Sequence, residues 1–267
     1  MDADLTRQVE ASFDGAADPR FADIMRSLVR HLHAFIADVH LTEEEWAAAI
    51  DFLTRTGQKC DAKRQEFILL SDVLGASMAV INVNHPTGGS ATEATVLGPF
   101  FVDDAPEFEH GADISGGAPG EPCFVSGTIR SPSGDPIAGA LLDVWQSDET
   151  GHYDVQYPEL ETPQGRGRLR TDDAGRYTFW SVQPEAYPIP HDGPVGDLLK
   201  AAGRGPMRPA HIHFKISAPG YRTLITHIFA AGDQYLQSDA VFGVKDSLIT
   251  EFDKTATFDF TLAPETP

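Results

Sequence analysis

Apolar and polar residues alternate at the period of an α-helix in the N-terminal third of the chain. Between residues 20 and 83, apolar side chains recur at steps of three and four positions. The most regular run consists of Phe21, Ile24, Leu28, Leu32, Phe35, Ile36 and Val39. This spacing places the side chains on one helical face, which has to be buried against another surface. The region is therefore predicted to be helical, with an apolar stripe that requires a partner.

Local signals mark where further helices begin and end. Thr42 and Glu45 fit a capping box, so one helix is expected to begin directly after Thr42 and to end at Gly57. A third helical stretch is expected from about Lys63 to Val83, where apolar side chains again fall on or near one face. The turn-forming residues that follow then break the helical pattern.

From about residue 120 the apolar period changes to two and turn signals multiply. Strands are expected at residues 123–129, 140–145, 168–170, 177–180, 211–216 and 223–230. Short strands separated by tight turns are typical of an antiparallel β-sandwich. The predicted fold class is therefore α+β, with a helical domain and linker over residues 1–95 and a β-sandwich domain over residues 96–267.

Charge and composition restrict the possible partners. The formal charge of −20 argues against nucleic acid, because a polyanion would be repelled. No run approaches the roughly 18 consecutive apolar residues that a membrane span needs, and the first residues do not resemble a signal peptide. Without a secretion signal, Cys60 and Cys123 are expected to be free thiols. We expect a cytoplasmic protein that neither spans a membrane nor binds nucleic acid.

Two histidines and two tyrosines are the candidate chemical groups. His211 and His213 are two positions apart in a predicted strand, so both rings lie on one face and can share a metal ion. Such a pair is also an ordinary surface or packing feature. Tyr153 and Tyr187 lie in long loops, which often carry function on a rigid scaffold. Tyr177 lies inside a strand and is expected to be a core residue.

The order of several motifs resembles the intradiol ring-cleavage dioxygenases. The motifs are Leu97-Gly98-Pro99-Phe100, Asp143-Val144-Trp145-Gln146, Gly151-His152-Tyr153, Gly175-Arg176-Tyr177, Tyr187 with its proline-rich loop, and Arg208-Pro209-Ala210-His211-Ile212-His213. The resemblance covers nearly the whole chain, and the N-terminal part is similar to the dimerisation region of the catechol dioxygenase branch. The segments 187–194 and 232–236 look most like the enzymes of that branch that cleave hydroxyquinol.

The resemblance implies one non-haem ferric ion per subunit, with Tyr153, Tyr187, His211 and His213 as its ligands. Phenolates are hard anionic donors that suit trivalent iron. Two phenolates and a hydroxide would also cancel the charge of the ion in a site of low dielectric constant. In this family the second tyrosine, here Tyr187, accepts a proton from the arriving diol and leaves the metal.

Two further residues are assigned roles by the same resemblance. Arg208 would stabilise negative charge that develops on a ring carbon, although a salt bridge to one of the 40 acidic residues is an open alternative. His227 stands where the plain catechol enzymes tend to have a glutamine. It is expected either to orient the substrate by a hydrogen bond or to support one of the metal ligands.

The resemblance also implies a substrate pocket. Its walls would comprise Leu69, Asp72, Val96, Leu97, Gly98, Pro99, Phe100, Ile189, Pro190 and Val241. The carboxylate of Asp72 could accept a hydrogen bond from a third substrate hydroxyl, which would discriminate against a diol that lacks it. Asp72 as a solvated helix position is an equally open interpretation.

The expected function is the opening of hydroxyquinol (1,2,4-trihydroxybenzene) by dioxygen in aromatic catabolism, giving 3-hydroxy-cis,cis-muconate or maleylacetate. Catechol or chlorocatechol is the alternative substrate. A transthyretin-like binding module and a zinc or copper enzyme that uses the histidine pair are the rival classes. The resemblance also implies a homodimer built through the N-terminal helices. The family places a phospholipid in the helical tunnel of such dimers, although no individual residue here demands one.

Overall fold

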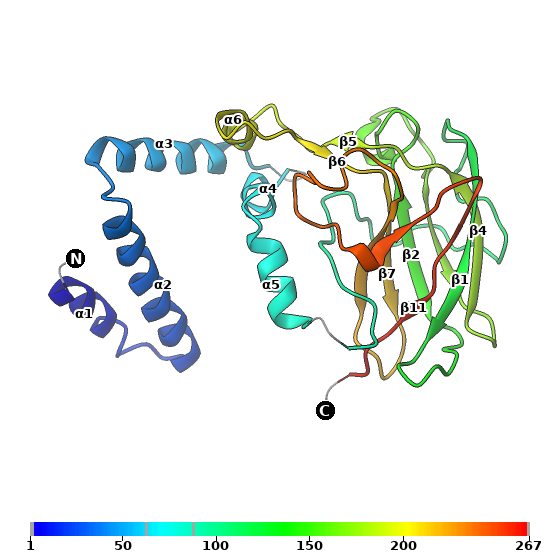
Figure 1. Cartoon of the computed structure of the whole chain (residues 1–267), viewed down its shortest axis with the longest axis horizontal. Coiled ribbons are helices and arrows are strands. Elements are labelled where there is room, and N and C mark those ends of the chain that lie inside the picture. Colours follow the sequence, from blue (N-terminus) through cyan, green and yellow to red (C-terminus); the bar gives the residue numbers. More distant parts are fainter. Residues whose placement is uncertain (1–2, 62–63, 87–88, 266–267) are drawn as a thin grey trace. The chain divides into compact units, whose positions relative to one another are not determined.

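The computed structural model describes residues 3–61, 64–86 and 89–265 and divides into two compact units (Figure 1). The first unit ends at Arg55 and the second begins at Thr56. Helices dominate the first unit, whereas the second contains three helices and all of the described β-strands. The predicted α+β class is confirmed.

The first unit is built from amphipathic helices. These are α1 (Ala3–Ala11), α2 (Pro19–Asp38) and the larger part of α3 (Glu43–Lys59). The predicted capping box at the start of α3 is present, because Thr42 Oγ1 accepts from the Glu45 amide at 3.2 Å and Glu45 Oε2 accepts from the Thr42 amide at 2.9 Å. The helix runs two residues past Gly57, so its predicted end was wrong.

The third predicted helical stretch is broken into two helices. Lys63, the expected start, lies outside the described residues, and the helices are α4 (Glu66–Val73) and α5 (Ala76–Asn84), bent by 75°. Gly75 adopts φ = +72°, a left-handed conformation that cannot continue an α-helix, so one continuous helix was the wrong prediction. Within the described ranges no single helix is long and apolar enough to cross a membrane; only this bent pair, taken together, reaches the necessary length and composition.

Two β-sheets form the body of the second unit. The five-stranded sheet has the order β3-β2-β7-β8-β9, and the four-stranded sheet has β1 paired with β4, β10 and β11. The strands are β1 (Pro122–Arg130), β2 (Leu141–Gln146), β3 (Arg166–Arg170), β4 (Arg176–Val182), β7 (His211–Ser217), β8 (Leu224–Ala230), β9 (Ile249–Thr250), β10 (Thr255–Thr257) and β11 (Phe260–Thr261). The long strands pair antiparallel as predicted, whereas the short strands β9, β10 and β11 pair parallel to their neighbours.

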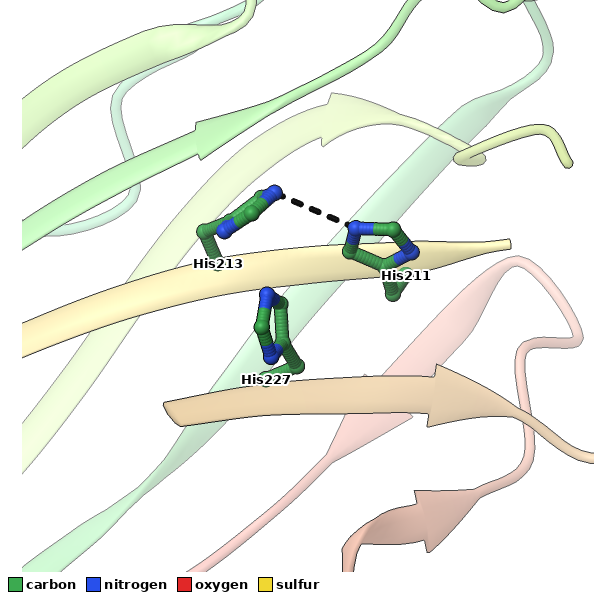
Figure 2. Close-up of side chains that lie close together, drawn as sticks. All are labelled: His211, His213 and His227. Carbon is green, nitrogen blue, oxygen red and sulfur yellow. Dashed lines mark hydrogen bonds between the residues drawn. The ribbon is translucent and has the colours of Figure 1, made fainter. Parts of the chain in front are cut away.

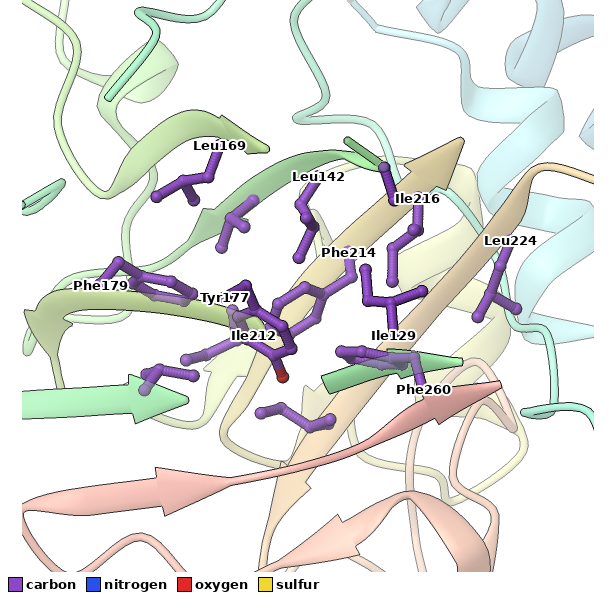
Figure 3. Packing of buried hydrophobic residues seen from close by; sticks show 14 of the residues in the cluster. Ile129, Leu142, Leu169, Tyr177, Phe179, Ile212, Phe214, Ile216, Leu224 and Phe260 are labelled. Carbon is purple, nitrogen blue, oxygen red and sulfur yellow. The ribbon is translucent and has the colours of Figure 1, made fainter. Parts of the chain in front are cut away.

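The hydrophobic core lies between the two sheets (Figure 3). On β7, Ile212, Phe214 and Ile216 are fully buried in this core, packed with side chains of β1, β2 and β4. Tyr177 also lies in the core, as predicted, and its hydroxyl donates to the Phe258 carbonyl at 2.7 Å. Because side chains alternate along a strand, the other positions of β7 point to the outer face of the five-stranded sheet.

One row of side chains crosses the outer face of this sheet. Trp145 pairs with Arg166 on β3 and with His213 on β7, and His213 pairs with His227 on β8. Residues in register on neighbouring strands point to the same side. A small third sheet of β5 (Tyr187–Pro188) and β6 (Met207–Arg208) pairs Tyr187 with Arg208. The remaining short elements of this unit are α6 (Pro194–Ala201) and the 3₁₀ turns at Asp154–Gln156 and Asp246–Leu248.

Candidate active site

Four donor atoms converge on the outer face of the five-stranded sheet. The Tyr153 hydroxyl lies 2.9 Å from His213 Nε2 and 3.2 Å from the Tyr187 hydroxyl. His211 Nε2 lies 3.1 Å from His213 Nε2 and 3.5 Å from the Tyr187 hydroxyl. Four ligands around one small metal ion lie about 3.3 Å apart, since metal–ligand distances are about 2.0–2.2 Å. The four side chains therefore have the spacing of ligands to a single ion.

The four side chains are protected from solvent, with at most 4% of any of them exposed. Burial raises the pKa of Tyr153 well above its usual value, and the neighbouring Tyr187 adds to this effect. Burial and the charge of Arg208 lower the pKa of both His211 and His213 well below the usual range. Both imidazoles are thus neutral at pH 7, the form that binds a metal. The His211 ring is oriented by its Nδ1, which lies 2.6 Å from the Pro209 carbonyl.

A third histidine stands next to the pair. Figure 2 shows His227 on β8 facing the rings of His211 and His213 on β7. The metal-binding nitrogen atoms of the three lie within 4.8 Å of one another, so together they could also hold an ion. The tyrosine–histidine set is tighter, because its four neighbouring separations are all 3.5 Å or less. His227 Nδ1 is hydrogen-bonded to the hydroxyl of Thr95, and its Nε2 has no hydrogen-bond partner among the described residues.

Arg208 is fully enclosed beside the donor atoms. Its Nη1 lies 3.2 Å from His211 Nε2, whereas Nε contacts Oδ1 of Asp239 at 3.1 Å. Burial lowers the pKa of this guanidinium, but the Asp239 carboxylate together with Tyr187 and Tyr153 outweighs that effect, and the pKa is raised overall. The salt bridge left open in the sequence analysis is therefore present, with Asp239 as partner, and it leaves one side of the guanidinium turned toward the donor atoms.

A second buried ion pair, between Arg166 and Asp154, holds the loop that carries Tyr153 in place. The guanidinium of Arg166 bonds both carboxylate oxygens of Asp154, one of them at 2.6 Å, and Arg166 Nη1 donates to the Phe100 carbonyl at 3.0 Å. Phe100 in turn stacks on the Tyr153 ring, with 4.4 Å between centroids. Arg166, which lies opposite Trp145 on the sheet, thus contacts both the loop that carries Tyr153 and the linker that carries Phe100. Neither Arg166 nor Asp154 was among the residues predicted from the sequence.

A pocket of about 680 Å³ adjoins this cluster, lined mainly by apolar side chains of α4, α5 and the linker before β1. Eight of the ten predicted wall residues line it: Leu69, Asp72, Val96, Leu97, Gly98, Pro99, Phe100 and Pro190. The other two, Ile189 and Val241, are buried in the apolar cluster that also contains Leu69 and Val96. Gly98 is the point where the pocket wall lies next to the donor atoms, because a Cβ atom at this position would lie 3.1 Å from Cε1 of His213.

Asp72 is a buried carboxylate in the mostly apolar pocket wall, only 7% exposed. Burial raises its pKa, while a hydrogen bond from Ser77 and the charge of Arg208 act in the opposite direction. The interpretation of Asp72 as a solvated helix position was therefore wrong. A carboxylate held in an apolar pocket is costly unless a polar group satisfies it.

Two family models cover most of the chain. Residues 18–92 match the model described as catechol dioxygenase N terminus, and residues 96–263 match the model described as dioxygenase. The chain belongs to the intradiol ring-cleavage dioxygenase family. This assignment confirms the predicted enzyme class and removes the non-enzymatic binding module as an alternative. A metal cofactor agrees both with the family and with the histidine cluster.

Individual members of the intradiol family are similar to the chain over nearly its full length. A 6-chlorohydroxyquinol 1,2-dioxygenase of Cupriavidus pinatubonensis is 54% identical, over 97% of this chain and 96% of the relative. A hydroxyquinol 1,2-dioxygenase of Rhodococcus opacus is 56% identical over 93% and 83%. The crystal structure of hydroxyquinol 1,2-dioxygenase from Pseudomonas putida DLL-E4 is 46% identical, with a TM-score of 0.93 over 98% of both chains.

Proposed function

We propose that this intradiol dioxygenase opens the ring of hydroxyquinol between its two adjacent hydroxylated carbons. The observation that carries the proposal is the buried carboxylate of Asp72 in the mostly apolar pocket beside the donor atoms. A pocket for plain catechol has no need of such an acceptor, whereas the third hydroxyl of hydroxyquinol would satisfy it. The relative at 56% identity is named for hydroxyquinol, and the relative at 54% identity is named for its 6-chloro derivative, which supports a trihydroxybenzene as the substrate.

The cofactor in this proposal is one ferric ion, held by Tyr153, Tyr187, His211 and His213. The fit rests on the spacing of the four donor atoms and on their chemistry. Two phenols that become phenolates supply two negative charges, and two neutral imidazoles supply none, which suits a hard trivalent ion better than zinc. When bound, ferric iron would draw electron density from the diol ring and so make a ring carbon reactive toward dioxygen.

Tyr187 is proposed as a base for the substrate. A diol that binds as a dianion has to lose two protons, and a phenolate oxygen next to the binding position can take one. Tyr187 suits this task because its hydroxyl makes the longest of the four contacts, 3.5 Å to His211 Nε2. It is also carried by the short pair β5–β6 rather than by the main sheet.

Arg208 and His227 are proposed to act on the substrate from two sides. Arg208 offers a fixed positive charge, with Nη1 3.2 Å from His211 Nε2, where charge on the ketonising ring would be stabilised. His227 offers Nε2, which has no hydrogen-bond partner in the described ranges, as a donor or acceptor toward the substrate. The pocket residues Leu69, Val96 and Pro190 would enclose the ring and exclude water.

The proposed reaction needs no further reductant. Hydroxyquinol and one molecule of dioxygen together contain the atoms of 3-hydroxy-cis,cis-muconic acid, whose keto tautomer is maleylacetate. The carbon–carbon bond between the two adjacent hydroxylated carbons breaks. Each of these carbons gains one oxygen atom and becomes a carboxyl group.

The test is oxygen uptake by the iron-loaded protein with hydroxyquinol and, separately, with catechol. Uptake at least ten times faster on hydroxyquinol, with a product of the mass of maleylacetate, is expected. Faster uptake on catechol would keep the reaction and reject the substrate. No uptake on either diol by protein that has bound iron would reject the proposed reaction. A colourless protein that retains zinc instead would favour the three-histidine site.

We also propose a homodimer formed through the N-terminal helices. The predicted stripe has six apolar side chains on α2 and a seventh, Val39, at its C-cap, and each is between 38% and 53% exposed in the single chain. Light scattering should give twice the mass of one chain, and Leu28→Glu should shift it toward the monomer. A monomeric wild-type protein would reject this proposal. The division of the domains after residue 95, the phospholipid and the cytoplasmic location stay predictions.

A further inference from the structure

Asp239 is a buried carboxylate whose place in the sequence gave no sign of a function. Only 5% of the residue is exposed, and both carboxylate oxygens are engaged. Oδ1 accepts from Arg208 Nε at 3.1 Å and from the Val241 amide at 3.3 Å. Oδ2 accepts from the Gly243 amide at 2.8 Å and lies 3.5 Å from Arg208 Nη2. The carboxylate therefore joins Arg208 to the turn that contains Val241.

The geometry of a guanidinium makes this contact directional. Its five N–H groups form a rigid planar fork, so holding one edge fixes where the other edge points. Asp239 holds the edge formed by Nε and Nη2, and the remaining nitrogen, Nη1, lies 3.2 Å from His211 Nε2. A side chain with free rotation would distribute this charge over several positions, whereas the observed pair restricts it to one.

The charge of Asp239 is as important as its shape. Arg208 is enclosed by protein, and a buried cation without a partner is strongly disfavoured. Asp72 also influences this cation, but it faces the pocket, where the proposed substrate would engage it. Asp239 is the carboxylate in direct contact with the guanidinium.

We propose that Asp239 is a positioning residue of the ring-cleavage reaction, which aims the Arg208 guanidinium at the reacting ring. The inference rests on the proposed role of Arg208. By the contacts to Val241 and Gly243, the same carboxylate sets the distance between Arg208 and this turn, whose Val241 belongs to the apolar cluster that contains Leu69 and Val96. Asp239 itself does not touch the substrate.

The principal variant is Asp239→Asn, which keeps the shape and one acceptor but removes the charge. We expect kcat per bound iron to fall by about 100-fold with little change in KM, because the lost interaction acts on charge that develops in the transition state. Iron content and the visible absorption of the tyrosinate–iron site should stay close to wild type. Unchanged kcat per iron would overturn the proposal.

A double-variant cycle separates positioning from folding. If Asp239 acts through Arg208, adding Asp239→Asn to Arg208→Gln should cause no further loss of kcat. It should also raise the melting temperature of the Arg208→Gln protein, since the unpaired buried carboxylate is removed. Independent, multiplying losses of kcat would show that Asp239 does not act through Arg208. Should Asp239→Asn alone fail to fold, a folded double variant supports the coupling, and an unfolded one rejects it.

Asp143→Asn is the matched control. Asp143 is also a buried carboxylate, paired with Arg168 at 3.0 Å on the same sheet, but it makes no described hydrogen bond or ion pair with the four donor residues or Arg208. This variant is expected to retain kcat per bound iron. An equal loss of kcat in both variants would reject a specific role for Asp239. The ratio of kcat per bound iron between variant and wild type is measured on hydroxyquinol and, separately, on catechol. A wild-type enzyme that prefers catechol would reject the proposed substrate but not the role of Asp239.

Discussion

The donor cluster and the pocket wall are neighbours, but they are held in place by different means. His211 and His213 are fixed by strand register in the middle of a five-stranded sheet. Buried ion pairs then fix the side chains around them. The pocket wall comes mainly from two short helices and a linker without regular structure, and Ile68 and Leu97 there remain at least one third exposed.

This difference indicates that the donor cluster determines the reaction and the pocket wall determines the substrate. Histidines that are set by strand register cannot move without disrupting the sheet, so this part of the molecule suits chemistry common to a whole family. A wall of helix and linker side chains can change one residue at a time, so it suits the choice of substrate. If this division holds, substitutions in the cluster should abolish the reaction, and substitutions in the wall should redirect it.

The largest effect is expected for Tyr153→Phe. Removing this hydroxyl deletes one of the four proposed ligands, and we expect kcat/KM to fall at least about 1000-fold, together with loss of bound iron or of its visible absorption. Tyr177→Phe is the control, because its hydroxyl is equally buried but bonds the Phe258 carbonyl in the core. The control should cost about 1 kcal/mol of stability and leave activity per iron unchanged. Equal losses of activity in the two variants would contradict the assignment of Tyr153.

The two regions also differ in how far the sequence could predict them. Because a strand has a period of two, the spacing of His211 and His213 was sufficient to place both rings on one face. The tyrosines were found only through the resemblance of their motifs, since no periodicity relates a loop residue to a strand. Asp239 could not be found, because a carboxylate meets a guanidinium 31 positions away only after the intervening loops have folded.

The helical side of the pocket was predicted less well for a related reason. The apolar pattern continues through the break between α4 and α5, and only the backbone conformation at Gly75 reveals the bend. Burial of Asp72 follows from that bend and from the linker, so its two interpretations could not be separated by sequence. The periodicity of apolar residues therefore predicted the helices and strands, whereas the burial of individual charged side chains depended on packing between segments far apart in the sequence.

The second-largest effect is expected for Asp72→Asn, the most direct substitution in the wall. Losing a hydrogen bond between a carboxylate and the third hydroxyl should lower the hydroxyquinol-over-catechol ratio of kcat/KM by about 10- to 100-fold. Activity on catechol should change less than threefold if the donor cluster is independent of the wall. An unchanged ratio would remove Asp72 from the specificity determinants.

The same variant should be more stable at neutral pH. Burial raises the pKa of Asp72, so the folded state binds this proton more tightly than the unfolded chain does. Ionised Asp72 therefore opposes folding above its folded-state pKa, and the cost disappears as the pH falls toward about 4, the ordinary value for aspartate. Melting curves from pH 8 to pH 4 should show the advantage of Asp72→Asn shrinking. An advantage that grows toward acid pH would contradict the buried, ionised state.

A smaller effect is expected where the two regions touch, at Gly98. This residue has φ = +78°, and an added Cβ would lie 3.1 Å from the His213 ring. Gly98→Ala should cost about 1–2 kcal/mol of stability from the backbone and lower kcat severalfold by displacing the ring. Gly220→Ala is the control, since Gly220 has φ = +80° with open space around its Cβ position. Equal kcat in the two variants would show that the linker does not constrain His213.

The smallest effect concerns the two thiols, which report solvent access in the sandwich core and at the end of α3 without altering activity. Cys123 lies on β1 in the sandwich core and is fully buried, and burial raises the pKa of its thiol to about 11. At pH 8 only about one molecule in a thousand would carry this thiolate, even before access is considered. Cys60, at the end of α3 and partly exposed, should therefore react with a disulfide reagent at least about 100-fold faster.

Mass spectrometry of partly labelled protein identifies the site, and equal labelling of both residues would mean that the sandwich opens on the timescale of the reaction. Unfolding in denaturant should abolish the difference, because it arises from packing and not from the local sequence.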